Sequence, residues 1–304
     1  MSRTFVILNP WAGRGAAGHK RAELEQALAD AGVDYTLRMT HVRGGATELT
    51  CQAIAQGFTR VVAVGGDGTI NEIVNGIKRA ETTEKRTAAL GIVPLGTGSD
   101  FARTAFGQGS KDLRAAVRRL VDGHTIAVDV GHVQVAGGDG RFFINGLGLG
   151  LDAQAAAEAL KIRRLKGLAV YLVAILRAQR SYQAPAMTVR YDGAHVRRRL
   201  LFASVANGRF QASGFLLTPD ARLDDGKLDV CIVDHMGLLG IVRHLPKVVQ
   251  GTHVRLKEVT LAQVRAVTVE AEGPIPVATD GEVVTTSART IHAHILPQSL
   301  ELLV

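Results

Sequence analysis

The chain has 304 residues, of which 46% are hydrophobic and 21% are charged, a composition typical of folded globular proteins with room for two domains. Its only cysteines, Cys51 and Cys231, lie far apart in the sequence, which excludes a disulfide-stapled fold and favours a reducing, cytoplasmic compartment. No apolar run reaches the roughly 18–20 residues that span a bilayer, and residues 1–10 indicate a strand rather than a signal peptide.

The formal net charge of +8 favours an anionic partner, such as a nucleotide or an acidic membrane surface. Nucleic acid is disfavoured as a partner, because only 5% of the residues are aromatic and no basic stretch is interleaved with them.

The first part of the chain alternates predicted strands and helices. Apolar residues at helical spacing predict helices that stop at Gly32, Gly57 and Gly123. The predicted strands cover residues 4–8, 34–39, 61–64 and 90–94. This order predicts a Rossmann-like, three-layer α/β domain in which helices cover both faces of a parallel sheet.

From about residue 125 the pattern becomes mostly antiparallel β. Hairpins are indicated by segments 125–135 and 141–145, and by Asp192-Gly193. Strands are also predicted over 187–191, 228–233, 264–271 and 290–296, and helices over 153–160, 167–180 and 237–249. We expect domains over 1–128 and 129–289 with a ligand cleft between them, and the sequence leaves open whether residues 290–304 return to the first domain.

The segment over residues 61–77 is the most informative part of the sequence. A predicted strand runs through Gly65, Gly66 and Gly68 into a predicted helix, which is typical of phosphate-binding turns. Asp67 stands in this turn, where its carboxylate would repel a phosphate unless a cation lay between them. The turn therefore predicts a nucleotide phosphate and a metal ion together.

A second glycine turn follows the strand that ends at Pro94. Residues 95–101 contain Thr97 and Asp100 just before a helix start. Taken alone, Asp100 would be interpreted as a residue that caps the helix starting there. Two such turns at the carboxyl ends of neighbouring strands favour a shared ligand site.

The sequence Gly13-Arg-Gly-Ala-Ala-Gly18 follows the first strand and matches a dinucleotide-binding pattern. Such a site needs an acid at the end of the second strand, where Thr40 and His41 stand instead. We therefore interpret this segment as a turn that shapes a nucleotide cleft, and we disfavour a dehydrogenase. The chain also lacks the motifs of an ordinary P-loop and of an α/β-hydrolase.

The loop Arg222-Leu-Asp-Asp-Gly-Lys-Leu-Asp229 places oxygen ligands at the close spacing that metal ions need, although such a sequence alone is more often a simple turn. Taken alone, residues 278–282 also indicate only a turn. The histidines have no zinc-site spacing, and we interpret His292 and His294 as structural.

Together these motifs resemble the diacylglycerol kinase catalytic-domain superfamily, which comprises bacterial lipid kinases and the sphingosine and ceramide kinases. The Gly-Gly-Asp-Gly-Thr motif alone is shared with NAD kinases and phosphofructokinases, so only the whole set is specific. The matching segments span nearly the whole chain in the family's order: Asn9-Pro10 with Gly13, Gly65-Gly-Asp-Gly-Thr69 with Asn71 and Glu72, Pro94-Leu-Gly-Thr-Gly-Ser-Asp-Phe101, Val128-Asp-Val-Gly131, Asn145-Gly146, Asn207-Gly208, Thr218-Pro-Asp-Ala221, Leu223-Asp-Asp-Gly-Lys-Leu228 and Asp280-Gly-Glu282.

The resemblance implies an α/β nucleotide domain, a C-terminal antiparallel β-sandwich and an active site between them. It implies that Glu282 is the general base and that Asp67, Asp100 and Asp129 organise a catalytic Mg²⁺. It further implies the following nucleotide-binding set: Asn9, Thr40, Gly65, Gly66, Asp67, Gly68, Thr69, Asn71, Gly96 and Thr97. A second, structural metal would be held by the loop matching Arg222, Asp225 and Lys227, the first and last through backbone carbonyls.

The sequence departs from the family's pattern at two places. Ser99 stands where the family usually has asparagine, which alters the nucleotide contacts expected there. After Asn207-Gly208, the family's glycine-rich run is replaced by residues 209–214, whose larger side chains would alter the acceptor pocket.

These features predict phosphoryl transfer from ATP to a lipid hydroxyl, most simply that of a diacylglycerol-like acceptor. The alternatives are a sphingoid-base or other lipid kinase, a soluble NAD-kinase-like enzyme, or a non-catalytic nucleotide-binding regulator. The acceptor would be reached at a membrane surface, peripherally on the inner face, and the oligomeric state, including a homodimer, stays open. The basic-flanked segment 161–180 is either the membrane contact or a helix packed on the second domain.

Overall fold

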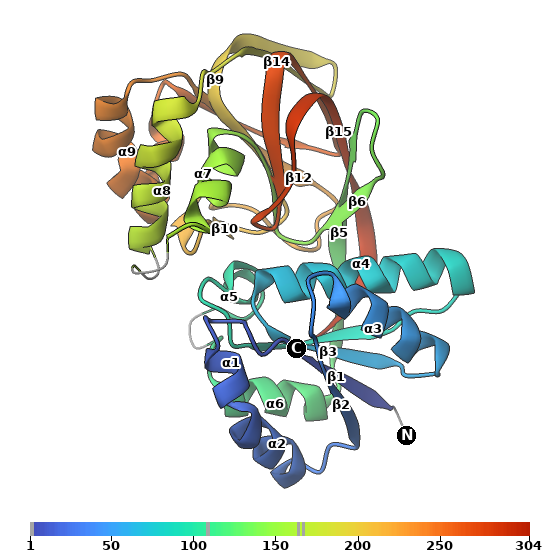
Figure 1. Cartoon of the computed structure of the whole chain (residues 1–304). Helices are drawn as coiled ribbons and strands as arrows, with labels where there is room; N and C mark the ends of the chain where they lie inside the picture. Colours follow the sequence, from blue (N-terminus) through green and yellow to red (C-terminus); the bar gives the residue numbers. More distant parts are fainter. Residues whose placement is uncertain (1–2, 108–109, 163–164, 166–167) are drawn as a thin grey trace. The chain divides into compact units, whose positions relative to one another are not determined.

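The computed structural model describes residues 3–107, 110–162, 165 and 168–304 (Figure 1). The chain divides into two compact units, one formed by Met1–Val128 with Gln298–Val304 and the other by Asp129–Pro297. Strands β5 (Thr125–Val135) and β15 (Glu282–Leu303) each contribute residues to both units. None of the helices in the described ranges is long and apolar enough to cross a bilayer.

The first unit is a parallel sheet with the strand order β4-β3-β1-β2, and the end of β15 adds to β4 through Leu302 and Leu90. Its elements are β1 (Thr4–Leu8), α1 (Ala16–His19), α2 (Arg21–Asp30), β2 (Tyr35–Met39), α3 (Gly45–Ala55), β3 (Arg60–Gly65), α4 (Asp67–Glu84), β4 (Ala89–Pro94), α5 (Asp100–Phe106) and α6 (Leu113–Asp122).

Helices cover both faces of this sheet, with α3 and α4 on one face and α2 and α6 on the other (Figure 1). Every residue of β1 and β4 is buried, as expected for parallel strands covered on both sides. The core on the α2 and α6 face joins Leu24 and Leu28 to Val117 and Leu120. The α/β architecture predicted from the sequence is confirmed.

The second unit is built from antiparallel strands. Its remaining elements are β6 (Arg141–Phe143), β7 (Gly146–Gly150), α7 (Leu151–Ala159), α8 (Leu168–Ser181), β8 (Ala186–Tyr191), β9 (Ala194–Ala206), β10 (Phe210–Gln211), β11 (Phe215–Leu216), β12 (Leu228–Asp234), α9 (Leu238–Gln250), the 3-10 helix η1 (Thr252–Arg255), β13 (Val259–Val264) and β14 (Ala266–Thr279). Strands β9 and β14 each pair with β7 at one end and with β8 at the other, so the strands wrap around one apolar core.

Helices α7, α8 and α9 gather on one side of these strands (Figure 1). A second apolar cluster lies between the helices and the outer faces of β9 and β12, and it includes Leu151, Ala174, Leu201 and Ile241. This layer gives the second unit two apolar interiors, one inside the strands and one beneath the helices.

Several strands differ from the sequence prediction. The strand predicted over 264–271 covers the last residue of β13 and the first part of β14, and the strand predicted over 290–296 is part of the longer β15. Strand β7 and the full length of β9 were not predicted. Strand β7 has the sequence Gly-Leu-Gly-Leu-Gly, and glycine weakens the strand signal. Its glycines make room for neighbouring side chains, since a Cβ on Gly148 would lie 2.3 Å from Oδ2 of Asp152.

One buried cation ties the C-terminal segment to the first unit. Lys78 of α4 is only 4% exposed, and its Nζ donates to the carbonyl of Ser299 and, over 2.8 Å, to Glu81. Because the ammonium is desolvated, these charge-assisted bonds stabilise the fold more than a surface ion pair does.

We expect Lys78→Met to lower the free energy of unfolding by about 1.5–3 kcal/mol, the usual cost of losing a hydrogen bond to a charged group. Urea titration monitored by circular dichroism measures the change. The matched control is Lys20→Met, which removes an exposed ion pair with Glu23 and should cost no more than about 0.5 kcal/mol. Equal effects of the two substitutions would contradict the tethering role of Lys78.

Candidate active site

The glycine turn after β3 is shorter than the sequence indicated. Gly65 ends the strand, Gly66 is the N-cap residue, and Asp67 and Gly68 already belong to the first turn of α4. The expectation that Gly68 lies in the turn and Asp67 in its middle is therefore wrong. The N-cap residue Gly66 has no side chain to cap α4, so the first-turn N–H groups and the dipole of this helix are suited to an anion such as a phosphate.

Three turns meet at the carboxyl edge of the parallel sheet. A Cβ on Gly96, after β4, would lie 2.4 Å from the Cα of Gly66, and a Cβ on Gly13, after β1, would lie 2.6 Å from the carbonyl oxygen of Leu95. Gly13 also has a left-handed φ of 60°. Only glycine allows these backbones to approach so closely, so the two turns predicted to share a site do lie together.

Asp67 links two of these turns. Its Oδ1 accepts a hydrogen bond of 3.2 Å from the N–H of Phe101 at the start of α5. Burial raises the pKa of Asp67, whereas the N–H groups of Phe101, Asp100 and Ser99 oppose this rise because they favour the carboxylate. Ser99 has a φ of 56°, a conformation that asparagine adopts more readily than serine, which explains physically why asparagine suits this position.

Other residues of the predicted nucleotide set surround this edge. Asn9 follows β1 and donates from Nδ2 to Oγ1 of Thr69 over 3.0 Å. Thr40 is buried after β2, and its N–H donates to the carbonyl of Leu8. Asn71 is buried in α4, whereas Thr97 is exposed.

Glu72 of the same motif has a structural role that the sequence did not reveal. Its two carboxylate oxygens accept hydrogen bonds of 2.9 Å from the N–H groups of Gly44 and Ala46 at the start of α3. Glu72 therefore caps α3 from the neighbouring helix α4.

The oxygen donors around Asp67 are of the kind that a divalent metal ion prefers. Mg²⁺ prefers one or two carboxylates, with waters and substrate phosphates completing its coordination. Asp67 and Asp100 supply hard oxygen donors at the two turns, and a cation would offset the burial that raises the pKa of Asp67. In the described ranges, no group of three or more His, Cys, Asp or Glu side chains is placed to hold a metal ion, so waters and substrate phosphates would have to complete its coordination.

In the second unit, Glu282 is placed by a tight hairpin. Asp280 and Gly281 form the turn between β14 and β15, both with positive φ, and Thr279 pairs with Glu282. Glu282 Oε2 accepts a hydrogen bond of 2.6 Å from Nη2 of Arg141, which fixes the direction of the half-buried carboxylate.

Asp280 anchors this hairpin to the start of β7. Its Oδ1 accepts from the N–H groups of Asn145 and Gly146, and its Oδ2 accepts from that of Ile144. These three bonds of 2.8–3.0 Å fix the turn that precedes Glu282. In the sequence Asp280 is recognisable only as part of a motif, and Arg141 carries no local signal of a partner 141 residues away.

Asp129 lies against the acidic loop of the same unit. It is fully buried, and its Oδ2 accepts from the N–H of Gly226 over 2.7 Å. Within the loop, Asp225 accepts from the N–H of Lys227 over 3.0 Å, whereas the side chain of Arg222 pairs with Asp224. The side chain of Arg222 thus points to Asp224 and that of Lys227 to Gln263, so any metal contact of these two residues would be through the backbone.

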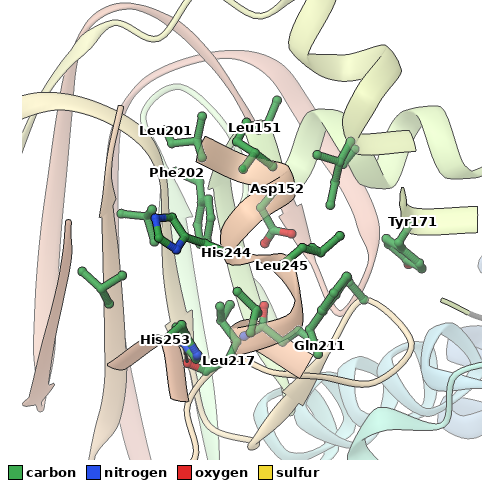
Figure 2. A pocket seen from close by; sticks show the side chains of 18 of the residues that line it. Leu151, Asp152, Tyr171, Leu201, Phe202, Gln211, Leu217, His244, Leu245 and His253 are labelled. Carbon is green, nitrogen blue, oxygen red and sulfur yellow. Dashed lines mark hydrogen bonds between the residues drawn. The ribbon is translucent and has the colours of Figure 1, made fainter. Parts of the chain in front are cut away.

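An apolar cavity with a volume of about 100 Å³ lies beneath the helices of the second unit. Figure 2 shows the carboxylate of Asp152 pointing into it, among side chains that include Leu201, Leu217 and Leu245. Burial raises the pKa of Asp152 to about 6. Asp152 was not predicted as a site residue, although a lone carboxylate in the mostly apolar run from Leu147 to Ala156 is a usable signal.

Two further segments bear on this cavity. Gln211 and Ala212, which belong to the run 209–214 that departs from the family's pattern, line it. In the segment 161–180, Val170, Ala174 and Ala178 of α8 pack into the apolar cluster beneath the helices. Arg163, Arg164 and Lys166, the basic residues before this helix, lie outside the described residues.

Two family models match the chain. The diacylglycerol kinase catalytic domain matches residues 3–133, and the YegS C-terminal NAD kinase beta sandwich-like domain matches residues 146–304. Each match falls largely on one of the two units described above.

Curated relatives cover nearly the whole chain. A diacylglycerol kinase of Bacillus subtilis is 27% identical over 93% of this chain and 90% of its own length. A diacylglycerol kinase of Mycobacterium tuberculosis is 29% identical over 93% and 89% of the two chains. A crystal structure of a diacylglycerol kinase from Bacillus anthracis, 20% identical, superposes with a TM-score of 0.74 over 99% of this chain and 96% of that one, which shows the shared fold.

The two units and their matches define a kinase that transfers phosphate to a hydroxyl group. The chain belongs to the diacylglycerol kinase catalytic-domain superfamily, the group of lipid kinases that its motifs resemble.

The raised pKa of Asp152 predicts a pH-dependent stability. A folded-state pKa of about 6, above the ordinary value of 3.8, means that the folded state keeps this proton to a higher pH than the unfolded chain does. The protonated Asp152 therefore stabilises the folded state below about pH 4, and this stabilisation is lost as the pH rises to about 6. The shift in pKa corresponds to at most about 3 kcal/mol of the free energy of unfolding.

Asp152→Asn should remove this part of the slope, as measured by urea unfolding at pH values from about 4 to 8. A residual slope is expected from Asp229, whose pKa burial also raises to about 6. The control Asp192→Asn changes an exposed hairpin turn and should keep the wild-type slope. An Asp152→Asn protein with the wild-type slope would show that this carboxyl group is not desolvated.

Proposed function

We propose that the chain is an ATP- and magnesium-dependent kinase that phosphorylates the hydroxyl group of a diacylglycerol-like lipid. The observation that carries the acceptor class is the cavity beneath α7, α8 and α9, whose lining is almost wholly apolar. Such a lining suits acyl chains and offers few hydrogen bonds for a sugar or a dinucleotide. The names of the relatives support the same acceptor.

The first unit would hold the ATP phosphates. The first-turn N–H groups of α4 and the turns at Gly65, Gly66 and Gly96 present backbone rather than side chains to an anion. Asp67 and Asp100 would hold Mg²⁺, which when bound would neutralise charge on the phosphate oxygens. Asp129, whose carboxylate accepts the N–H of Gly226 in the second unit, stays a predicted member of this set. Asn9 and Thr69 would support the same turn through their mutual hydrogen bond.

The second unit would supply the base and the acceptor. Glu282 would take the proton of the acceptor hydroxyl, and Arg141 and the Asp280 turn would hold its carboxylate in place. The loop with Arg222, Asp225 and Lys227 would bind a second, structural metal. In support, its neighbour Asp229 has a raised pKa to which the nearby charges of Asp225 and Asp220 contribute after burial, and a cation would relieve this repulsion.

A sphingoid base is the second candidate acceptor, and one observation favours it. Asp152 is a carboxylate inside the apolar cavity, where an acceptor ammonium group would pair with it. A diacylglycerol has no charge to offer this side chain.

Glu282→Gln tests the role of the proposed base. The amide keeps an oxygen that can accept from Arg141 but cannot take a proton, so we expect kcat to fall by about 10²–10⁴-fold with ATP affinity unchanged. Glu270→Gln, in an exposed pair with Arg190, is the matched control and should keep wild-type turnover. Near-normal turnover of the Glu282→Gln protein would remove Glu282 from the mechanism.

A panel of lipid and soluble substrates, assayed with the purified protein, identifies the acceptor. ATP consumption is measured with dioleoylglycerol, sphingosine, phosphatidylglycerol or NAD as the acceptor. Turnover with dioleoylglycerol alone supports the proposal, and turnover with sphingosine that is lost in Asp152→Asn supports the second candidate. Turnover with NAD only, or with none of the four, contradicts both.

A further inference from the structure

Helix α9 exposes an unusual amount of apolar surface. Leu239 is 84% exposed and Val242 is 50% exposed, and Leu238 and Val249 of the same helix are also largely open to solvent. Exposed apolar groups of this size, gathered on one element, typically mark a contact surface.

These side chains form a stripe that is separate from the packed face of the helix. Leu239, Val242, Pro246 and Val249 are spaced by three, four and three residues, which places them along one side of α9. The opposite, inward side carries Ile241, His244, Leu245 and Val248, which line the apolar cavity (Figure 2). The helix is therefore apolar on two sides, and only one of them is covered by the second unit.

The edge of the exposed stripe is basic. Arg243 and Lys247 are exposed, one helical turn apart, and neither forms an ion pair with any part of the chain that the structure describes. The segment from His235 to Lys257 also contains Arg255 and no acidic residue. An apolar stripe with a cationic border complements a bilayer surface with anionic headgroups, because the side chains enter the acyl region while the charges remain at the headgroups.

We propose that α9 is a membrane-docking helix that seats the second unit on an anionic lipid surface. Its exposed stripe inserts at the level of the headgroups, and Arg243 and Lys247 bind the lipid phosphates. Because the other side of the same helix lines the cavity, docking through α9 brings the cavity next to the lipid that it is proposed to accept. The choice of a membrane rather than a protein as the occupant rests on the proposed lipid-kinase function.

Vesicle co-sedimentation tests the proposal without any catalysis. The vesicles contain phosphatidylcholine with about one-third phosphatidylglycerol and no diacylglycerol. Arg243→Glu/Lys247→Glu and Leu239→Ser/Val242→Ser should each lower the fraction bound by about tenfold or more, since each reversed or removed contact weakens binding severalfold. Vesicles of phosphatidylcholine alone should bind the wild-type protein weakly.

Helix α6 offers matched controls for both variants. Arg114 and Arg118 are exposed and one turn apart, so Arg114→Glu/Arg118→Glu makes the same charge change on another helix. Val121 is 48% exposed, close to the 50% of Val242, so Val121→Ser matches the Val242→Ser part of the apolar variant. Both control proteins should bind vesicles as the wild type does, and urea unfolding verifies that all variants are equally folded.

The outcomes separate this proposal from the proposed function. Wild-type binding by both α9 variants overturns the docking role of α9, even if the lipid kinase activity is confirmed. Variants that change a dimer into a monomer by light scattering, with vesicle binding unchanged, also overturn it and make α9 an interface between copies. Conversely, loss of vesicle binding in the α9 variants supports docking even if no lipid acceptor is phosphorylated. The α9 variants should also retain turnover of detergent-dispersed acceptor, because they leave Asp67 and Glu282 intact.

Discussion

The proposed nucleotide site depends on one steric constraint, the close approach of the backbone at Gly66 and Gly96. A methyl group at Gly96 would lie 2.4 Å from the Cα of Gly66, closer than carbon atoms pack. This approach brings the start of α4 within reach of the start of α5, where Asp67 accepts the N–H of Phe101. Two helix starts are thereby held together at one edge of the sheet, which concentrates N–H donors and carboxylates where phosphates and a cation can be bound together.

In the second unit, side-chain hydrogen bonds rather than close glycine contacts hold the polar groups of the candidate site in place. Asp280 accepts three backbone N–H groups, and Arg141 holds Glu282. These polar contacts are satisfied next to an apolar core, where unsatisfied groups would be costly. Beneath the helices, Asp152 is the exception: a carboxylate in an almost apolar cavity, with a pKa raised by burial. Such a group is a candidate for acceptor recognition.

The sequence predicts most of the fold but only part of the candidate site. The strands β1 and β4 and the hairpin turn at Asp192-Gly193 were predictable because buried runs and turn residues are local signals. Strand β7 was missed because its glycines serve tertiary packing, and the long β9 because half of it is exposed and basic.

The pairing of Arg141 with Glu282, the cap from Glu72 to α3 and the cavity around Asp152 were not predictable, since each joins residues distant in sequence. The exposure of one apolar side of α9 was also not predictable, because a sequence shows that a helix is apolar but not which of its sides the neighbouring elements cover.

The most direct test of this account is the affinity for Mg²⁺·ATP, measured by isothermal titration calorimetry on the Gly96→Ala protein. The control is Gly45→Ala, which adds a methyl group in the same unit at a distance of 3.6 Å or more from its neighbours. If the approach of Gly66 and Gly96 builds the nucleotide site, Gly96→Ala should bind Mg²⁺·ATP about tenfold or more weakly than the wild type, and Gly45→Ala should bind it normally. Wild-type affinity in a folded Gly96→Ala protein would contradict the account.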